Sequence, residues 1–527
     1  MSVGFRKNIS TFSLTMTGVT TIIGSGWLLS TQKIANIAGP AGLVAWVIGA
    51  LVALLVGLFY IEIGSANPSS GGIGYYSHLT HGRFCGFLTS WINWLSIVAV
   101  APIEAQSIVQ YLSQLSPSFN RFYDLPTHAL THSGIAFAVI LMAFLMFINY
   151  WSVQLFIRFN NLLTVFKVAV PLLTIIALVY SGFHPENFGA SVNSPTSFMP
   201  FGFQSILVSV VTCGVVMSFN GFQSPLNFSE EIANPKKMLP IAVIGSILIA
   251  FIVYFLLQAV FIGSIDPSVV AKGWNHINLR SPYVDLLLAL NLQMMVTVVY
   301  VSSVVSPGAC GAAFIATSSR ILYSLSKEKH LPAFISLLHP AYQNPRKAIV
   351  ICTLVGCIFL FLFRGWYELV GVLSVIHLFS YLPAPIIVIA NRLKNKALTS
   401  KKDQFILPMA NLFSPILLFI LSALLFSAAW PLTGEMLYLI IPGLCFYIYY
   451  EYKNHRGKGF ATAFKGASWL IIYIIAISLI AYLGNNPGRG DANLSITTSL
   501  VLLAILAIFT HFFGAYFAID RAKYERA

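Results

Sequence analysis

Apolar stretches long enough to cross a lipid bilayer follow one another along almost the whole chain of 527 residues. A helix needs roughly 20 apolar residues to span about 30 Å of hydrocarbon, and runs of this kind recur from end to end. Hydrophobic residues make up 57% of the sequence and charged residues 9%, whereas soluble domains are roughly 25% charged. This balance excludes a soluble enzyme, a disordered protein and a secreted disulfide scaffold. It predicts a polytopic membrane protein.

The apolar runs give about fourteen candidate spans. They are 12–38, 40–65, 84–115, 131–151, 156–181, 203–228, 240–264, 284–325, 347–363, 366–391, 407–428, 434–451, 464–485 and 495–519. The runs are unbroken, whereas the strands of a membrane barrel would alternate polar and apolar residues with period two. The expected fold class is therefore all-α.

Basic residues are distributed unevenly between the two sides of this topology. With the N-terminus in the cytoplasm, 23 Lys and Arg lie on the inner side. Five lie on the outer side, namely Arg121, Lys272, Arg280, Arg364 and Arg489. Because basic residues favour the cytoplasmic side, we expect a multi-pass protein of the cytoplasmic (inner) membrane with both termini in the cytoplasm. The net charge of +14 is then an orientation signal, and no nucleic-acid partner is expected.

The cysteines predict neither a disulfide framework nor a metal site. All six lie in or beside apolar spans, as Cys85, Cys213, Cys310, Cys352, Cys357 and Cys445. No C-x-x-C pair occurs, so we interpret them as small buried hydrophobes and expect no metal or cofactor. The first apolar stretch lacks the small-residue cleavage site of a signal peptide, and none is expected.

Glycine and polar residues interrupt two of the spans. The first span contains Thr20-Thr21-Ile22-Ile23-Gly24-Ser25-Gly26, and the sixth contains Ser218-Phe219-Asn220-Gly221-Phe222-Gln223-Ser224-Pro225. Each stands first in a block of five spans, which indicates an inverted repeat whose broken helices meet near the bilayer midplane. The alternative for Gly-Ser-Gly is a small-residue seam between packed helices. Two interruptions in equivalent places favour the broken helices.

The expected division of the chain follows from this repeat. It consists of a cytoplasmic N-terminus at 1–11, a first five-helix repeat at 12–181, a second, inverted repeat at 203–391, four additional transmembrane helices at 407–519, and a cytoplasmic C-terminus at 520–527.

The chemistry of the site follows from the helix ends. If the first span unwinds around Ile22–Gly24, a half-helix begins at Ser25-Gly26 and presents free N–H groups. A helix N-terminus carries roughly half a positive charge, which suits a carboxylate. The carbonyl groups before the break, and those near Phe219 and Asn220, suit an ammonium group. Two such breaks together predict a receptor for a zwitterion, that is, for an amino acid.

Four stretches resemble the amino acid–polyamine–organocation superfamily of permeases. They are Ile22–Gly26, Glu62–Gly72 with its Asn-Pro-Ser-Ser-Gly-Gly end, Glu230–Pro240 with the pattern E-x-x-N-P-x-x-x-x-P, and Ser319–Pro332. Within the superfamily the chain looks most similar to bacterial aspartate–proton symporters, through Gly24–Leu28, Asn149–Val153 and Ser306-Pro307-Gly308.

The resemblance implies a leucine-transporter-like fold with a 5+5 inverted repeat, broken helices one and six, and four further helices. It implies that Ser25 and Gly26 hold the substrate carboxylate, that Ile22 offers a carbonyl to the ammonium group, and that Gly24 lies at the same break. Phe219, Asn220 and Gly221 match the lining from helix six. Met217 stands where some relatives carry a gating tryptophan, so Phe222 or Phe219 is expected to close the site instead.

Among the ionisable residues inside predicted spans, Lys167, Glu104 and His377 are the candidates for proton handling. The resemblance matches Lys167 with a helix-five lysine that replaces a sodium ion in proton-coupled members. Lys167 either binds and releases the coupled proton or extends its ammonium group to the inner interface of the membrane. Glu104 is either a second proton carrier or a protonated, hydrogen-bonded carboxyl, and His377 either handles protons or is a satisfied core histidine.

The expected function is secondary active import of an amino acid by proton symport with alternating access. The substrate expected is aspartate or another small amino acid. Small polar donors such as Asn220, Gln223 and Gln106 are candidates for an acidic side chain, because no span carries an arginine at mid-depth. The alternatives are an amino acid exchanger and a substrate-binding sensor of the same fold.

A membrane enzyme is disfavoured. The pairs His78/His81 and His128/His132 have metal-like spacing, but we place them in surface loops without accompanying carboxylates. No G-x-x-x-x-G-K phosphate loop is present. Glu62, at the inner end of the second span, is expected to order the loop that follows it.

Overall fold

The computed structural model describes residues 9–69, 71–151, 153–189, 197–340, 342, 344–394, 404–428, 430–456, 459–485 and 493–519. The side chains of 153–161 and 455 are outside this description. Most of the predicted cytoplasmic N-terminus, all of the predicted C-terminus at 520–527, and Ser70 of the loop motif also lie outside the described residues.

Helices make up nearly all of the described structure. The first group comprises α1 (Thr11–Ile22), α2 (Gly26–Ala38), α3 (Gly42–Ala66), α4 (Gly72–Val98), α5 (Val100–Leu112), α6 (His132–Trp151) and α7 (Val153–Ser181). The second comprises α8 (Gly202–Thr212), α9 (Val215–Phe219), α10 (Ser224–Asn227), α11 (Pro235–Gly263), α12 (Pro267–Val270), α13 (Pro282–Ala289), α14 (Gln293–Lys327), α15 (Arg346–Leu362), α16 (Trp366–Tyr381) and α17 (Pro383–Lys394). The last comprises α19 (Ala410–Ser427), α20 (Leu432–His455), α21 (Phe460–Leu483) and α22 (Ile496–Tyr516).

Short elements connect these helices. They are the 3-10 turns η1 (Gly39–Ala41), η2 (Pro117–Phe122), η3 (Pro185–Phe188), η4 (Ser229–Glu231), η5 (Trp274–His276) and η6 (Ala333–Ser336), and an antiparallel pair of two-residue strands, β1 (Tyr123–Asp124) and β2 (Ala129–Leu130).

The prediction of an all-α polytopic membrane protein is confirmed. Among the described residues, 11 helical stretches are long and apolar enough to cross a membrane. One of them, Gly26–Ala66, joins α2 and α3 and so covers parts of two predicted spans. The predicted spans 203–228 and 347–363 correspond to shorter helices, α8 to α10 and α15. The grouping into two inverted repeats of five helices stays a prediction.

Both predicted helix breaks are present. The first break comprises Ile23–Ser25, between the end of α1 and the start of α2. The second comprises Asn220–Gln223, between α9 and α10. Gly221 has a φ of 112° in the second break, and a Cβ there would lie 2.6 Å from the backbone carbon of Thr21. A residue without a side chain is therefore required where the two breaks touch.

Some predicted spans contain bends that their hydropathy did not indicate. The predicted span 284–325 is two helices, α13 and α14, separated where Asn291 adopts a φ of 58°. Asparagine tolerates this left-handed conformation better than most residues do. Gly214 (φ 85°) divides α8 from α9, and Gly82 (φ 83°), just before the predicted span 84–115, bends α4. Hydropathy averages over such single-residue turns, so it cannot show them.

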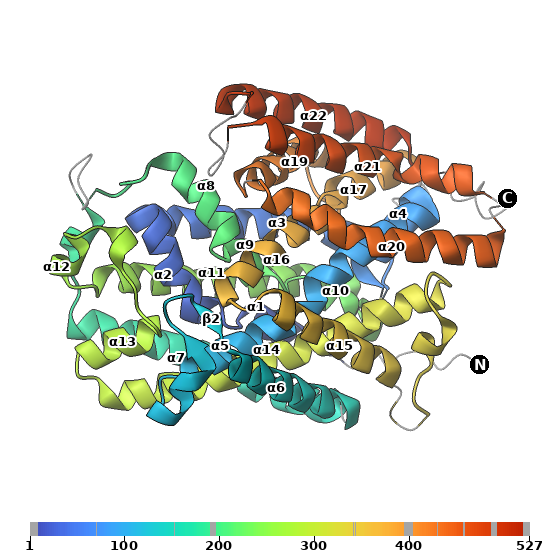
Figure 1. Cartoon of the computed structure of the whole chain (residues 1–527). Helices are drawn as coiled ribbons and strands as arrows, with labels where there is room; N and C mark the ends of the chain where they lie inside the picture. Colours follow the sequence, from blue (N-terminus) through green and yellow to red (C-terminus); the bar gives the residue numbers. More distant parts are fainter. Residues whose placement is uncertain are drawn as a thin grey trace.

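Figure 1 shows the four C-terminal helices, drawn from orange to red, gathered along one side of the molecule. α19 contacts α22, α21 and α17, and α21 contacts α4. On the other side of the core, α1 packs against α11, α7 and α14. The broken helix is thus enclosed by helices from both halves of the chain.

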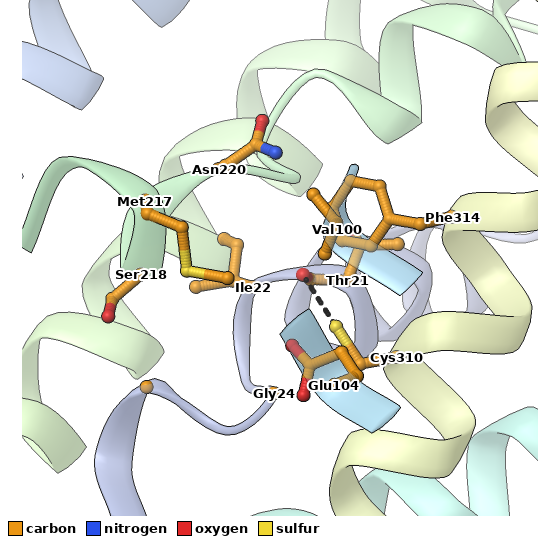
Figure 2. Close-up of a pocket in the computed structure, with 11 residues that line it drawn as sticks. Thr21, Ile22, Gly24, Val100, Glu104, Met217, Ser218, Asn220, Cys310 and Phe314 are labelled. Atoms are coloured by element: carbon orange, nitrogen blue, oxygen red, sulfur yellow. Dashed lines mark hydrogen bonds between the residues drawn. The ribbon is translucent and has the colours of Figure 1, made fainter. Parts of the chain in front are cut away.

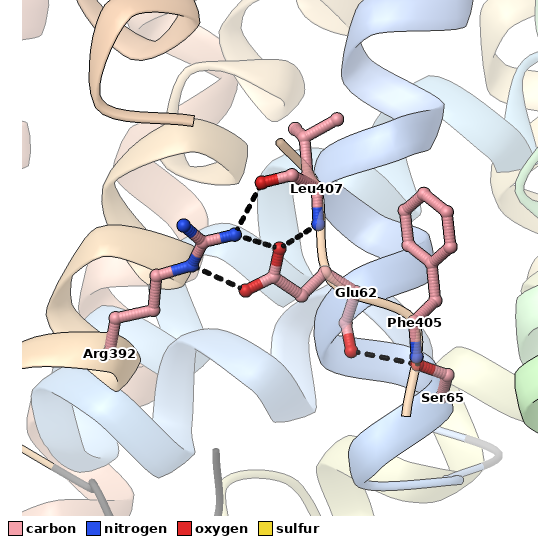
Figure 3. Close-up of polar contacts among 5 residues, drawn as sticks. All are labelled: Glu62, Ser65, Arg392, Phe405 and Leu407. Carbon is pink, nitrogen blue, oxygen red and sulfur yellow. Dashed lines mark hydrogen bonds and ion pairs between the residues drawn. The ribbon is translucent and has the colours of Figure 1, made fainter. Parts of the chain in front are cut away.

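Glu62 is placed differently from the prediction. Its carboxylate accepts two hydrogen bonds from Arg392 of α17, at 2.7 and 2.6 Å, and a third from the backbone N–H of Leu407 at 2.8 Å (Figure 3). Ser65, one turn later on α3, accepts from the N–H of Phe405 at 3.0 Å. Glu62 therefore joins α3 to α17 and to the segment before α19, because a buried carboxylate needs donors that its own helix cannot supply.

The prediction that His81 is a surface residue is wrong. It is fully buried in α4, where its Nδ1 lies 2.8 Å from the Thr80 hydroxyl and its Nε2 lies 3.1 Å from the carbonyl oxygen of Gly514. The ring therefore links α4 to α22.

Candidate functional site

Side chains from three helices meet the backbone carbonyl groups at the first break. The donors are Lys167 to Thr20 (2.7 Å), Cys310 to Thr21 (3.4 Å), Tyr254 to Ile22 (2.8 Å), and Ser306 to Ile23 and Gly24 (3.4 and 3.3 Å). The last carbonyl groups of a helix have no hydrogen-bond partner within the helix, and in an apolar interior each of them needs a donor from elsewhere. Residues of α7, α11 and α14 thus compensate for the broken backbone of α1.

The N-terminus of α2 faces a carboxylate. The backbone N–H of Ser25 donates to the Oε2 atom of Glu104 at 2.8 Å. Glu104 belongs to α5 and is 1% exposed. The Ser25 hydroxyl accepts from the indole nitrogen of Trp366 at 3.0 Å. The half-helix therefore binds a carboxylate at its N-terminus, as its partial positive charge predicts, but this carboxylate belongs to the protein.

Glycine is required on either side of Ser25. A Cβ atom at Gly24 would collide with Oε1 of Glu104, and one at Gly26 would collide with the hydroxyl of Ser218. The Gly-Ser-Gly sequence thus allows α5 and α9 to approach the break directly.

A small cavity lies between the two breaks (Figure 2). It is lined by Thr21, Ile22, Gly24, Gly26, Val100, Glu104, Met217, Ser218, Asn220, Cys310 and Phe314. In Figure 2, Glu104 and Cys310 lie beside the first break, and Met217 and Asn220 lie on the side of the second. The free space is about 10 Å³, close to what one water molecule needs. An amino acid fits there only if surrounding groups, Glu104 among them, move.

Six of the predicted site residues line this cavity, namely Ile22, Gly24, Gly26, Met217, Asn220 and Glu104. The others lie around it. Ser25 is at the break itself, and Gly221 contacts Thr21 across the breaks through its carbonyl oxygen, which accepts from the threonine hydroxyl at 3.0 Å. Lys167 is fully buried behind the break on α7 and interacts electrostatically with Glu104.

Neither phenylalanine proposed as a gate lines the cavity. Phe219 packs edge-on against Trp46 and Tyr254, with ring centroids 6.0 and 5.7 Å apart. Phe222 packs against Tyr381 at 5.6 Å. The aromatic side chain in the lining is Phe314 of α14.

Sequence reasoning missed Thr21, Val100, Ser218, Cys310 and Phe314. One signal was available for α14: Ser306, Cys310 and Phe314 are spaced by four residues and so share one helix face. The interpretation of Cys310 as a buried hydrophobe omitted its thiol, which donates to Thr21. Val100 has no local signal, because its position depends on how α5 packs.

Two polar groups in the lining have no hydrogen-bond partner among the described residues. They are the Nδ2 atom of Asn220 and the hydroxyl of Ser218. The Oδ1 atom of Asn220 accepts from Nε2 of Gln223 at 2.8 Å, which leaves the amide nitrogen as the unused donor. A buried donor without a partner is costly, so both groups are suited to a polar ligand.

Other candidate residues lie away from the cavity lining. His377 Nδ1 lies 2.8 Å from the Leu373 carbonyl oxygen on its own helix. Gln106 donates to the carbonyl of Phe363 at 2.6 Å. Within the described ranges no group of three His, Cys, Asp or Glu residues is arranged to hold a metal ion.

Comparisons with known proteins agree with this architecture. The sequence model of a family described as amino acid permease matches residues 9–448. The chain is 42% identical to the glutamate/serine transporter AimA of Bacillus subtilis (strain 168), over 95% of this chain and 92% of that protein. It is 31% identical to the aspartate-proton symporter of the same organism, over 99% and 98%. It is also 26% identical to the human cationic amino acid transporter 4, over 66% and 53%.

Proposed function

This chain belongs to the amino acid permease family, and from that premise we propose that it imports an amino acid by proton symport with alternating access. Both full-length relatives named above are transporters, and one is named for proton coupling. The observation that carries the proposal is the pair of helix breaks around one cavity, with an N–H group directed at a carboxylate and carbonyl groups close by. The excess of basic residues on the inner side of the predicted topology supports a location in the cytoplasmic membrane with both termini in the cytoplasm.

The α-carboxylate of the substrate binds at the N-terminus of α2, at the N–H groups of Ser25 and Gly26. Its ammonium group binds the carbonyl of Ile22 and those near Phe219. A carbonyl oxygen has two lone pairs, so Ile22 can accept from a ligand while it accepts from Tyr254. Both ends of the amino acid are then satisfied by backbone groups.

Glu104 occupies the place of the substrate carboxylate. Its carboxylate accepts the N–H of Ser25 that the substrate requires, and there is little free space beside it. Two carboxylates at one helix N-terminus would repel each other. A proton that binds Glu104 removes its charge and weakens its bond to the N–H, so the substrate replaces it. Proton uptake therefore favours substrate binding, and release of the substrate favours release of the proton.

Lys167 is the second group in this exchange. Its ammonium group donates to Thr20 on the last turn of α1 and interacts with Glu104. When Glu104 is protonated, its charge no longer attracts the ammonium group of Lys167, and the hydrogen bond of Lys167 to Thr20 remains. The position of α1 then follows the protonation of this pair.

The unused donors in the lining support small polar and acidic substrates. Asn220 Nδ2 can donate to a side-chain hydroxyl or to a carboxylate, and the Ser218 hydroxyl can donate to either and can also accept from a hydroxyl. Serine, glutamate and aspartate, the amino acids that name the two full-length relatives, each carry such an oxygen. These three are the substrates we propose.

Purified protein in proteoliposomes tests the proposal. We expect accumulation of radiolabelled glutamate, serine or aspartate only with an inward proton gradient, and no accumulation of leucine. Stimulation by internal substrate without any effect of the pH gradient would instead identify an exchanger. Binding without uptake would identify a sensor.

Glu104→Gln tests the role of Glu104 itself. The variant keeps the shape of the side chain and removes its charge, so counterflow is expected to continue while proton-driven accumulation is lost. Substrate affinity should no longer change with pH. Glu368→Gln, at an exposed position in the first turn of α16, is the matched control and should behave as wild type. Accumulation by Glu104→Gln at the wild-type level would contradict the mechanism.

A further inference from the structure

An apolar groove lies between α5, α6, α7 and α14, away from the cavity between the breaks. Its volume is about 640 Å³, within the usual range for ligand sites. Its lining consists of apolar residues, and the wall from α6 includes Phe144 and Phe147, which are 60% and 59% exposed. The wall from α14 includes Val304 and Gly308. All of these residues lie on stretches that are long and apolar enough to cross the membrane, so the groove faces lipid.

A basic residue lies at one end of this groove. Trp151, the last residue of α6, lines the groove, and its ring centroid is 5.1 Å from the guanidinium carbon of Arg346. That carbon also lies 4.2 Å from the ring centroid of Tyr150 and 4.7 Å from that of Tyr342. Tryptophan and tyrosine at the end of a spanning helix mark the level of the lipid headgroups. The groove therefore runs from the hydrocarbon region to a cation at the interface.

One donor group of Arg346 has no hydrogen-bond partner among the described residues. Its Nε donates to the carbonyl of Tyr150 at 3.2 Å. Its Nη2 atom is buried and has no partner among the described residues. Lys347, the next residue of α15, is exposed. Arg346 therefore lies beside one end of the apolar groove, and Lys347 follows it in the chain, with its ammonium group 5.6 Å from the ring centroid of Phe334.

We propose that this groove and Arg346 form a binding site for an anionic phospholipid, with an acyl chain in the groove and the phosphate at Arg346 and Lys347. A guanidinium group binds phosphate oxygens through paired N–H donors. Basic pockets between membrane helices are typical sites for anionic headgroups. A free phosphate would leave the groove unused. A zwitterionic lipid would bring its own ammonium group towards Lys347, so the charge of the site selects an anionic lipid.

The groove lies against α14, on a different face from the one that donates hydrogen bonds to the first break. On α14, Ser306 and Cys310 face α1, whereas Val304, Gly308 and Ala312 face the groove. These two sets are each spaced by four residues and lie on different faces of the helix. An acyl chain in the groove therefore packs against the helix that donates to the carbonyls of Thr21, Ile23 and Gly24.

The test is native mass spectrometry of the purified full-length chain titrated with dioleoylphosphatidylglycerol. Arg346→Gln removes the cation, and we expect it to lower the apparent affinity about five-fold, the usual effect of one basic contact with an anionic headgroup. Gly308→Leu fills the groove from within. A Cβ at Gly308 has no heavy atom within 4 Å, so this variant should fold and lose binding of the acyl chain. Lys465→Gln is the matched control, since Lys465 lies over the ring of Phe517 and is no part of the groove.

Competing ligands distinguish the sources of the phosphate. Dioleoylphosphatidylcholine should bind the wild type more weakly than phosphatidylglycerol does, and the difference between the two lipids should be smaller for Arg346→Gln. Glycerol 3-phosphate should not displace the lipid. The proposal is overturned if Gly308→Leu binds phosphatidylglycerol like wild type, if Arg346→Gln keeps the full preference for the anionic lipid, or if glycerol 3-phosphate competes as well as the lipid does. Thermal unfolding of each variant establishes that it is folded before it is titrated.

Discussion

The ammonium group of Lys167 lies 2.7 Å from the carbonyl oxygen of Thr20, on the last turns of α1 before the first break. The hydroxyl groups of Thr20 and Thr164 also meet, so α7 is bonded to α1 at two neighbouring points. Lys167 is fully buried, and a buried ammonium group is stable only with such acceptors. The position of the end of α1 is thereby tied to the charge of one side chain.

Lys167→Ala should abolish proton-driven accumulation and leave exchange of substrate across the membrane intact. The reason is that the variant removes the cation that holds Thr20 but leaves the lining of the cavity unchanged. Uptake with an imposed pH gradient, compared with counterflow, measures the two activities. Lys33→Ala is the control, because Lys33 also lies within a predicted span, 12–38, but its ammonium group lies over the ring of Tyr367. Unchanged proton-driven accumulation in Lys167→Ala would contradict a role of Lys167 in proton coupling.

Tyr254→Phe should lower both stability and transport. The Tyr254 hydroxyl donates to Ile22 at 2.8 Å and to Ser218 at 3.3 Å, and so joins the two breaks. The hydroxyl has one proton, which the two carbonyl groups share, and its removal leaves both buried acceptors without this donor, so we expect a loss of about 1–3 kcal/mol in the free energy of unfolding. Tyr283→Phe is the control, since that buried hydroxyl donates to Leu257, away from the breaks. It should be destabilised less and should transport normally.

Gly24→Ala should impair folding and transport because the added methyl group meets two side chains. It collides with Oε1 of Glu104 and would lie 2.8 Å from the Cys310 sulfur, and such overpacking costs about 1–3 kcal/mol. Glu104→Ala in the same chain removes the closer collision, so the double variant should be more stable than Gly24→Ala alone. Thermal unfolding of both single variants and the double variant measures this coupling. Additive effects would show that the two residues do not meet.

Glu62→Gln should destabilise the protein far more than a similar change at the surface. Glu62 is buried and binds Arg392 and Leu407 by charged hydrogen bonds, each worth about 1.5–3 kcal/mol. Glu186→Gln is the comparison, because its partner His184 is on an exposed loop, where solvent screens the ion pair. Thermal unfolding should place Glu62→Gln well below Glu186→Gln. Equal midpoints would contradict the importance of the junction in Figure 3.

Glu328 should make stability depend on pH near neutrality. It follows the last residue of α14, and burial raises its pKa to about 7, although Ser324 and Lys327 act in the opposite direction. The folded protein thus binds a proton that the unfolded chain has already lost between about pH 4.5 and 7. Stability from this group is complete at low pH and is lost as pH rises through about 7. In Glu328→Gln, thermal midpoints should fall less between pH 5.5 and 8 than in wild type. An equal fall would exclude this assignment.

Local features of the sequence were sufficient to predict the two breaks. Gly24-Ser25-Gly26 and Asn220-Gly221 interrupt apolar helices with residues that favour turns, and the breaks are where these residues lie. The bend at Asn291 was missed because the residues directly before and after it, Leu290 and Leu292, are apolar, and mean hydropathy does not register one left-handed residue. A helix break made by several glycine and polar residues can therefore be predicted from the sequence, whereas a bend within a continuous apolar run cannot.

Long-range partners could not be predicted in the same way. Glu104 was identified as an ionisable residue inside the membrane, but its bond to Ser25 depends on how α5 is rotated against α2. The same holds for Glu62, whose partner Arg392 lies 330 positions later in the chain. The spacing of side chains shows which residues share one face of a helix. Which helix packs against that face depends on the arrangement of all the helices together.

The five carbonyl groups from Thr20 to Gly24 have donors on three different helices. No small rotation of α1 preserves all of these bonds, since α7, α11 and α14 approach it from different directions. Intermediate positions would leave several carbonyls unsatisfied, at about 1–3 kcal/mol for each one. The first broken helix therefore behaves as a two-position element with a high barrier between its positions. Movement of this helix between its positions then requires that all of these donors are exchanged together.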